Sequence, residues 1–116
     1  MTEIPKVVSN YFKYKNEHDK AGLLSVLSTD VVIIDRGENK ELKHIEEIER
    51  WIDKSLTGIN LHTEISSTKE EGGVWEVQTI VSGDFKASPA KFIYYIKLDR
   101  EKICFVDIEF GGSLNK

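Results

Sequence analysis

Asp35 is the side chain best suited to accept a proton. It directly follows residues 31–34, a run of branched apolar side chains that predicts a buried strand. A carboxylate at the end of such a strand, beside an apolar pocket, can act as a general base. Two plainer interpretations stay open. Asp35 is a solvated loop residue, or it forms an ion pair with its neighbour Arg36.

Tyr11 and His62 are the candidate partners of Asp35. Tyr11 lies on the apolar stripe of a predicted helix, where its hydroxyl could donate a hydrogen bond to a developing oxyanion. His62 begins a predicted strand, and an inward imidazole near Asp35 would be an acid–base partner. The alternatives are a core role for Tyr11 and an exposed position for His62. Asp35, Tyr11 and His62 are therefore the candidate catalytic residues.

Five other side chains are expected to line a ligand pocket: Trp51, Trp75, Tyr94, Phe12 and Thr79. Strand alternation places Trp75 and Thr79 together on the inward face. Tyr94 is favoured over Tyr95 as the inward tyrosine, because Tyr95 shares its face with Lys97. Packing in the core is the competing interpretation for both tryptophans.

Two acids near the C-terminus, Asp107 and Glu109, are expected on the outer face of the sheet. They alternate with the apolar residues Val106, Ile108 and Phe110 along the last predicted strand. If the apolar set faces the helices, both carboxylates point outward, and only a bulge would reverse this.

The sequence lacks the motifs of several other kinds of site. The histidines His18, His44 and His62 show no metal-ligand spacing, so no zinc site is expected. There is no phosphate-binding glycine-rich loop, dinucleotide fingerprint or nucleophile elbow, and we expect no cofactor. Cys104 is the single cysteine, which excludes an internal disulfide, and its alternation with Val106 predicts a small buried side chain.

Composition limits the class of protein. The chain has 116 residues, of which 40% are hydrophobic and 31% charged, and the net charge is −4. This length and balance predict one folded domain over residues 1–116, with a flexible tail at 111–116. An acidic chain favours neither a nucleic-acid partner nor an anionic membrane surface. With no signal peptide, no membrane-spanning run and one cysteine, we expect a cytoplasmic protein.

The elements that must position these residues change type along the chain. Apolar residues at helical spacing predict a first helix from about residue 4, with Pro5 in its first turn, and a second helix capped by Asp19. Residues 28–30 are expected to end the second helix, and residues 35–40 to form a loop. The expected ranges are a third helix at 42–56, stopped at 57–58, and strands at 31–34, 60–69, 74–85, 91–98 and 102–110.

Helices followed by a meander of strands are typical of the α+β class. The three N-terminal helices are the only elements able to cover one face of the sheet. We therefore expect a curved, mainly antiparallel sheet wrapped around these helices, with a cavity between them.

The C-terminal half carries a recognisable pattern. Val81-Ser-Gly-Asp-Phe-Lys-Ala-Ser-Pro89 leads into the aromatic strand Phe92-Ile-Tyr-Tyr-Ile-Lys-Leu98, an acidic turn and Lys102-Ile103. This resembles the nuclear-transport-factor-2-like (NTF2-like) superfamily in its SnoaL-like branch. The first half agrees in the order of its elements. The resemblance implies a cone-shaped α+β fold with a deep pocket, often dimeric through the outer sheet face.

Three functions follow from the residues and the resemblance. The first is a domain that binds a small hydrophobic molecule in an apolar pocket. The second is an isomerase, cyclase or dehydratase of the ketosteroid isomerase-like or polyketide cyclase-like kind, with Asp35 as base. The third is a homodimer that uses Ile80, Ile93 and Tyr95 on the outer face as an interaction surface. The epoxide hydrolases of the superfamily need an Asp-Arg-Asp trio, which the positions of the three arginines do not favour.

Overall fold

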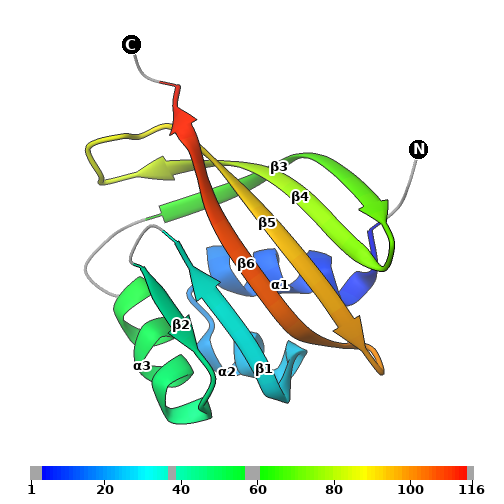
Figure 1. Cartoon of the computed structure of the whole chain (residues 1–116). Coiled ribbons are helices and arrows are strands. Elements are labelled where there is room, and N and C mark those ends of the chain that lie inside the picture. The colour runs from blue at the N-terminus through cyan, green and yellow to red at the C-terminus, as the bar shows by residue number, and fades with distance from the viewer. Residues whose placement is uncertain (1–3, 37–38, 57–60, 115–116) are drawn as a thin grey trace.

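The computed structural model describes residues 4–36, 39–56 and 61–114. Within these ranges there are three helices and six strands (Figure 1). The helices are α1 (Lys6–Asn16), α2 (Lys20–Val26) and α3 (Ile45–Leu56). The strands are β1 (Leu27–Asp35), β2 (Lys40–Leu42), β3 (Leu61–Glu71), β4 (Val74–Gly83), β5 (Ala90–Asp99) and β6 (Lys102–Ser113).

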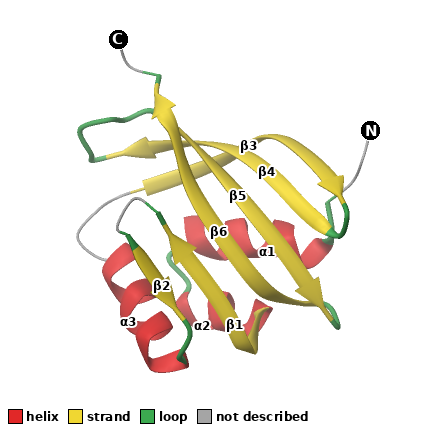
Figure 2. Ribbon diagram, viewed as in Figure 1, coloured by secondary structure: helices red, strands yellow, loops and turns green. Residues whose placement is uncertain are grey.

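The six strands form one mixed sheet in the order β2-β1-β6-β5-β4-β3. β1 runs parallel to β6, and the other neighbours are antiparallel. The sheet is strongly curved, and the three helices lie on the same side of it (Figure 2). The α+β class and the sheet wrapped around three helices are thus confirmed.

Local sequence signals explain where the helices begin. The carboxylate of Asp19 accepts a hydrogen bond from the backbone nitrogen of Gly22 at 2.9 Å, as predicted for the cap of α2. Pro5 is the residue before α1 rather than part of its first turn. At α3, a carboxylate oxygen of Glu47 accepts from the backbone nitrogen of His44 at 3.3 Å, one half of a capping box.

Several predicted boundaries are wrong. Residues 28–30 belong to β1, and residues 40–42 form β2, so α3 begins at Ile45 rather than at 42. Leu42 is apolar because it pairs with Ile33 on the inner face of the sheet, not because it starts a helix. Residues 111–113 extend β6 where a flexible tail is expected, since Ser113 pairs with Ala90. The predicted stop at 57–58 lies outside the described residues.

The core lies between the concave face of the sheet and the helices. Its buried residues come from every element except β3 and are Val8, Tyr11, Phe12, Leu23, Val26, Leu27, Val31, Ile33, Leu42, Ile48, Ile52, Val77, Tyr94, Ile96, Ile103, Val106 and Ile108. Burial of so much apolar surface in one cluster is the main source of stability for a domain of this size.

Strand alternation places most side chains as predicted. Thr79 and Tyr94 face inward, and Ile80, Ile93 and Tyr95 are half-buried positions on the alternate face. Asp107 faces outward, where it holds the Arg36 guanidinium in two hydrogen bonds of 2.8 Å.

The prediction that Cys104 is buried is wrong. This residue is only half-buried rather than part of the core. The register between β5 and β6 shifts at this point, because Lys97 pairs with Phe105 but Leu98 pairs with Ile103. The resulting bulge leaves both Ile103 and Val106 facing the core.

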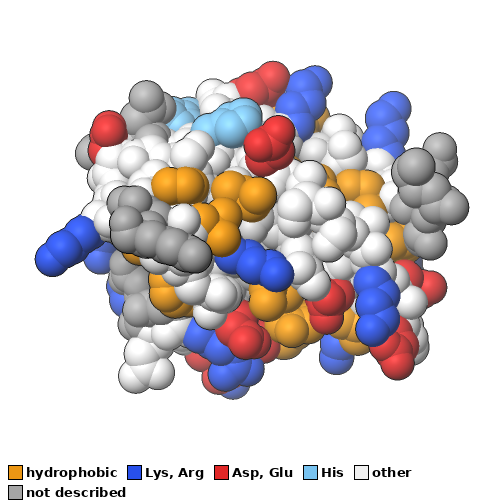
Figure 3. Space-filling model, turned by 90° about the horizontal axis from the view of Figure 1, so that it is seen from above, with side chains coloured by type: hydrophobic (Ala, Val, Ile, Leu, Met, Phe, Trp, Pro, Cys, Tyr) orange, Lys and Arg blue, Asp and Glu red, His pale blue; other side chains and the backbone are white. Residues whose placement is uncertain are grey.

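The surface carries charges of both signs. Acidic and basic side chains are interspersed on the face shown in Figure 3, with small groups of hydrophobic side chains between them. Among the described helices, none has the length and apolar character needed to cross a bilayer.

Candidate functional site

Asp35 and Trp51 meet on the inner side of the sheet. Asp35 shares a strand face with the buried residues Val31 and Ile33, so its carboxylate points toward the helices. The indole nitrogen of Trp51, on α3, donates a hydrogen bond to Asp35 Oδ2 at 3.0 Å. No other hydrogen bond of Asp35 is found within the described part of the chain. One carboxylate oxygen is thus held by Trp51, and the other makes no hydrogen bond within these residues.

Three buried aromatic rings pack beside this pair. Tyr11 and Phe12 come from α1 and Tyr94 from β5, and each is at most 3% exposed. The Phe12 ring contacts the Tyr94 and Tyr11 rings edge-to-face, with centroid distances of 5.0 and 5.1 Å. The Tyr11 and Tyr94 centroids are 6.2 Å apart. Two phenol groups are thus held close together under the sheet.

The charge of Asp35 acts on both tyrosines. Burial raises the pKa of Tyr11 well above its ordinary value, and the negative charge of Asp35 raises it further. The pKa of Tyr94 is raised by burial first, then by Tyr11 and Asp35. Both hydroxyls are therefore uncharged hydrogen-bond donors at neutral pH. Neither has a hydrogen-bond partner among residues 4–36, 39–56 and 61–114.

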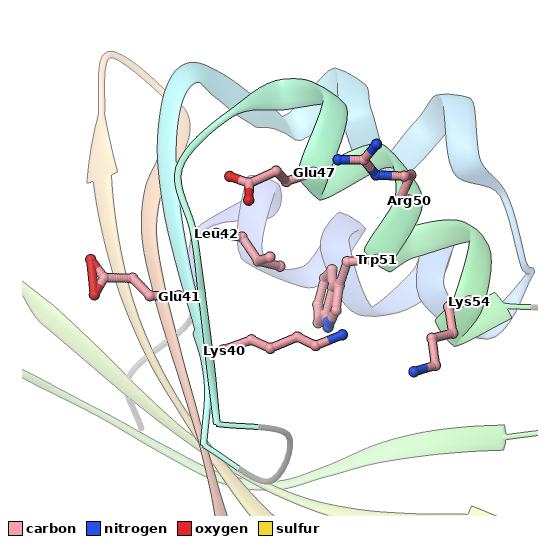
Figure 4. A pocket seen from close by; sticks show the side chains of 7 residues that line it. All are labelled: Lys40, Glu41, Leu42, Glu47, Arg50, Trp51 and Lys54. Atoms are coloured by element: carbon pink, nitrogen blue, oxygen red, sulfur yellow. The ribbon is translucent and has the colours of Figure 1, made fainter.

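Trp51 also lines a cleft of about 450 Å³ between α3 and β2 (Figure 4). Lys40 and Leu42 enter it from β2, and Arg50 and Lys54 flank the indole on α3. A second hollow of about 300 Å³, lined in part by Asp35 and Lys40, lies at the ends of β1 and β2. Trp51 thus lines one hollow and Asp35 the other.

A polar group lies farther along α1. Lys15 Nζ donates to Thr63 Oγ1 at 2.8 Å, across to β3. Asn16 binds the backbone of Thr63 twice, with its amide nitrogen 2.8 Å from the carbonyl oxygen and its amide oxygen 2.7 Å from the backbone nitrogen. Thr63 is only 3% exposed. These bonds join the end of α1 to the inner face of β3.

Comparison with known proteins rests on solved structures, since no protein-family model and no curated protein matches the sequence. A proposed polyketide cyclase from Sinorhizobium meliloti superposes with a TM-score of 0.84 at 24% identity, over 91% of this chain and 95% of that chain. A protein with a ketosteroid isomerase-like fold from Catenulispora acidiphila gives 0.79 at 16% identity, over 91% and 85%. An NTF2-like protein of unknown function from Cytophaga hutchinsonii gives 0.74 at 11% identity, over 95% and 92%.

The chain has the NTF2-like fold. The resemblance seen in the sequence is therefore confirmed at the level of the fold. At sequence identities below 25%, the roles of individual residues in these proteins cannot be transferred to this chain. What the site of this NTF2-like chain can do depends on its own side chains.

The structure brings five of the eight predicted site residues together and separates three. Asp35, Trp51, Tyr11 and Tyr94 form one cluster with Phe12. The alternative in which Asp35 pairs with Arg36 is wrong, because Arg36 binds Asp107 on the opposite face.

His62, Trp75 and Thr79 lie outside this cluster. His62 is exposed, because its neighbour Thr63 takes the inward position on β3. The hydroxyl of Thr79 donates to the backbone oxygen of Phe92 at 2.9 Å, a structural bond within the sheet. Trp75 packs against the edge of the core. Their roles in ligand binding stay predictions.

Sequence reasoning missed Lys15, Asn16 and Thr63. A signal was available for Lys15, since it lies one turn after Tyr11 and two turns after Val8 on the inward stripe of α1. No local pattern pairs Asn16 with Thr63, because that contact depends on how α1 crosses the sheet.

Proposed function

We propose that this NTF2-like domain binds a small hydrophobic molecule on the concave face of the sheet. Its apolar body would lie against Tyr11, Phe12 and Tyr94, and its polar group against Asp35. The observation that carries the proposal is the inward carboxylate of Asp35, fixed through one oxygen by Trp51. Sites for small molecules combine an apolar lining with a few oriented polar groups, and these residues would supply both.

A second function, proton transfer next to a carbonyl group, is favoured by one observation. The Asp35 carboxylate lies within electrostatic reach of two uncharged tyrosine hydroxyls. Asp35 would take the α-proton of a ketone, and a tyrosine hydroxyl would stabilise the enolate oxygen by hydrogen bonding. Return of the proton to another carbon would complete an isomerisation. Such a reaction would be of the kind that an isomerase or cyclase carries out.

Binding is tested with 2-acetonaphthone, a hydrophobic aryl ketone. We expect titration to shift the resonance of the Trp51 indole N–H in the wild type. The shift should weaken in Asp35→Asn and persist in Glu64→Gln, which removes an exposed acid on β3. Absence of any shift at the solubility limit of the ketone, in all three proteins, would contradict binding at this site.

Proton transfer is tested separately, in deuterium oxide. Asp35 as base predicts that the wild type exchanges the acetyl protons of 2-acetonaphthone faster than buffer does. Asp35→Asn should abolish the acceleration, and Tyr11→Phe should reduce it about 100-fold or more, the usual range for loss of an oriented donor. Binding without accelerated exchange would leave a binding protein and remove the enzyme.

A further inference from the structure

Lys15 places a cationic group on the concave side of the sheet, where the ligand is proposed to bind. It lies on the same stripe of α1 as Val8, Tyr11 and Phe12, all of which are buried. Its ammonium group reaches the hydroxyl of Thr63, which is itself buried on the inner face. Lys13, two residues earlier, is instead exposed. The direction of the Lys15 side chain therefore follows from the pitch of the helix.

This ammonium group has no acidic partner among the residues that the structure describes. Its one bond is to the neutral hydroxyl of Thr63, although an ammonium can donate three. Asn16 satisfies the backbone of Thr63 and keeps that hydroxyl in place. The other lysines that contact acids do so at exposed positions, as Lys20 does with Asp53 at 3.0 Å.

A partly buried charge without a counter-ion is unfavourable, and burial lowers the pKa of Lys15 to about 8. Among the described residues, no charged neighbour contributes to this change in pKa. Asp35, Tyr11 and Tyr94 lie on the same inner side, while His62 and Glu64 flank Thr63 on the exposed face of β3. At neutral pH the group is still mostly protonated. An anion placed beside it would supply the missing countercharge.

We propose that Lys15 binds the anionic group of the ligand, so that the ligand is an amphipathic organic anion such as a hydrophobic carboxylate or sulfonate. The inference rests on the proposed function, because it needs a ligand under the sheet. One helical turn, about 6 Å, separates Lys15 from Tyr11 along α1. A ligand that lies against Tyr11 would need to extend by this length, roughly 6 Å, to reach Lys15.

The proposal predicts a link between binding and protonation. An anion beside Lys15 stabilises the ammonium form, so binding takes up a proton when part of the population is neutral. The affinity for an anion should fall as pH rises from 7 to 9.5, through the pKa of about 8. The affinity for a neutral ligand of the same shape should not change over this range.

The test uses two fluorescent probes that differ only in charge. They are 8-anilinonaphthalene-1-sulfonate and N-phenyl-1-naphthylamine, the same molecule without the sulfonate. In the wild type at pH 7 we expect the sulfonate to bind about tenfold more tightly than the neutral probe. Lys15→Met should remove that preference, while Lys15→Arg and the exposed control Lys13→Met should keep it within about threefold.

Two further measurements make the result specific. The Trp51 indole N–H resonance reports binding under the sheet, and thermal melting confirms that each variant is folded. Glu64→Gln, which removes an exposed carboxylate beside Thr63 on β3, should keep the pH profile of the wild type.

The outcomes separate the two proposals. If both probes shift the Trp51 resonance and Lys15→Met leaves their affinity ratio unchanged, the role of Lys15 is wrong and the proposed function stands. If neither probe shifts that resonance, the proposed function fails and this inference fails with it.

Discussion

The indole nitrogen of Trp51 lies 3.0 Å from Oδ2 of Asp35, and this bond joins the middle of α3 to the last residue of β1. It holds the carboxylate in one orientation. Val31 and Ile33, which share the strand face of Asp35, are apolar and offer its carboxylate no hydrogen bond. The indole of Trp51 supplies the polar partner instead. The charge of this carboxylate raises the pKa of both Tyr11 and Tyr94, so the three groups share one region of the inner side.

Trp51→Phe removes this donor and keeps an aromatic ring. We expect the free energy of unfolding to fall by about 1.5–3 kcal/mol, the range for a hydrogen bond to a charged group. Urea denaturation measures the change. Trp75→Phe is the control, because Trp75 is also half-buried at the edge of the core and no hydrogen bond of its indole is found in the described part of the chain. An equal loss in both variants would show that only ring size matters.

Tyr11 and Tyr94 should resist ionisation. Burial and the Asp35 charge raise the pKa of both. Ultraviolet titration should therefore show two of the four tyrosines protonated until the protein unfolds. The unfolded chain loses these protons near pH 10, so the free energy of unfolding should fall as pH rises above that value. Ionisation of all four tyrosines near pH 10 in the folded protein would contradict the buried pair.

Lys15 has the opposite effect on stability. Its pKa is about 8 in the folded chain, whereas the ordinary value for a lysine, 10.5, applies to the unfolded chain. Between these two pH values the unfolded chain therefore binds more protons than the folded chain. Its contribution to the free energy of unfolding should therefore rise from pH 8 to 10.5. The difference in stability between Lys15→Met and the wild type should favour the variant at pH 7 and shrink as pH increases. A difference that is constant with pH would mean that Lys15 is well solvated.

Gly22 should not tolerate a methyl group, although alanine favours helices. A Cβ atom at this position in α2 would lie 2.5 Å from Cδ1 of Tyr14 and 2.7 Å from Oδ2 of Asp19. The Tyr14 ring and the cap of α2 would both have to move. We expect Gly22→Ala to lower the free energy of unfolding by about 1–3 kcal/mol, measured by urea denaturation. A stabilised variant would show that the two helices are loosely packed.

Much of the fold was predictable because it depends on periodicity. The inward positions of Tyr11, Tyr94 and Thr79 follow from helix and strand repeats, and the cap at Asp19 from one residue type. β2 was not predictable, since a strand of Lys40–Leu42 is too short to show alternation and Leu42 continues the stripe of α3.

Long-range pairing accounts for the rest of the site. The bond between Asp35 and Trp51 and the contact of Lys15 with Thr63 join elements far apart in sequence. Such contacts depend on the crossing of helices over the sheet, which periodicity does not determine. The homodimer through the outer face stays a prediction.

The most direct test is to locate a bound ligand by nuclear Overhauser effects in a complex with 2-acetonaphthone. The naphthalene protons should contact the rings of Tyr11, Phe12 and Tyr94, and the acetyl group should lie beside Asp35. Contacts confined to Tyr95 and Ile93, on the outer face of the sheet, would contradict a binding site on the concave side.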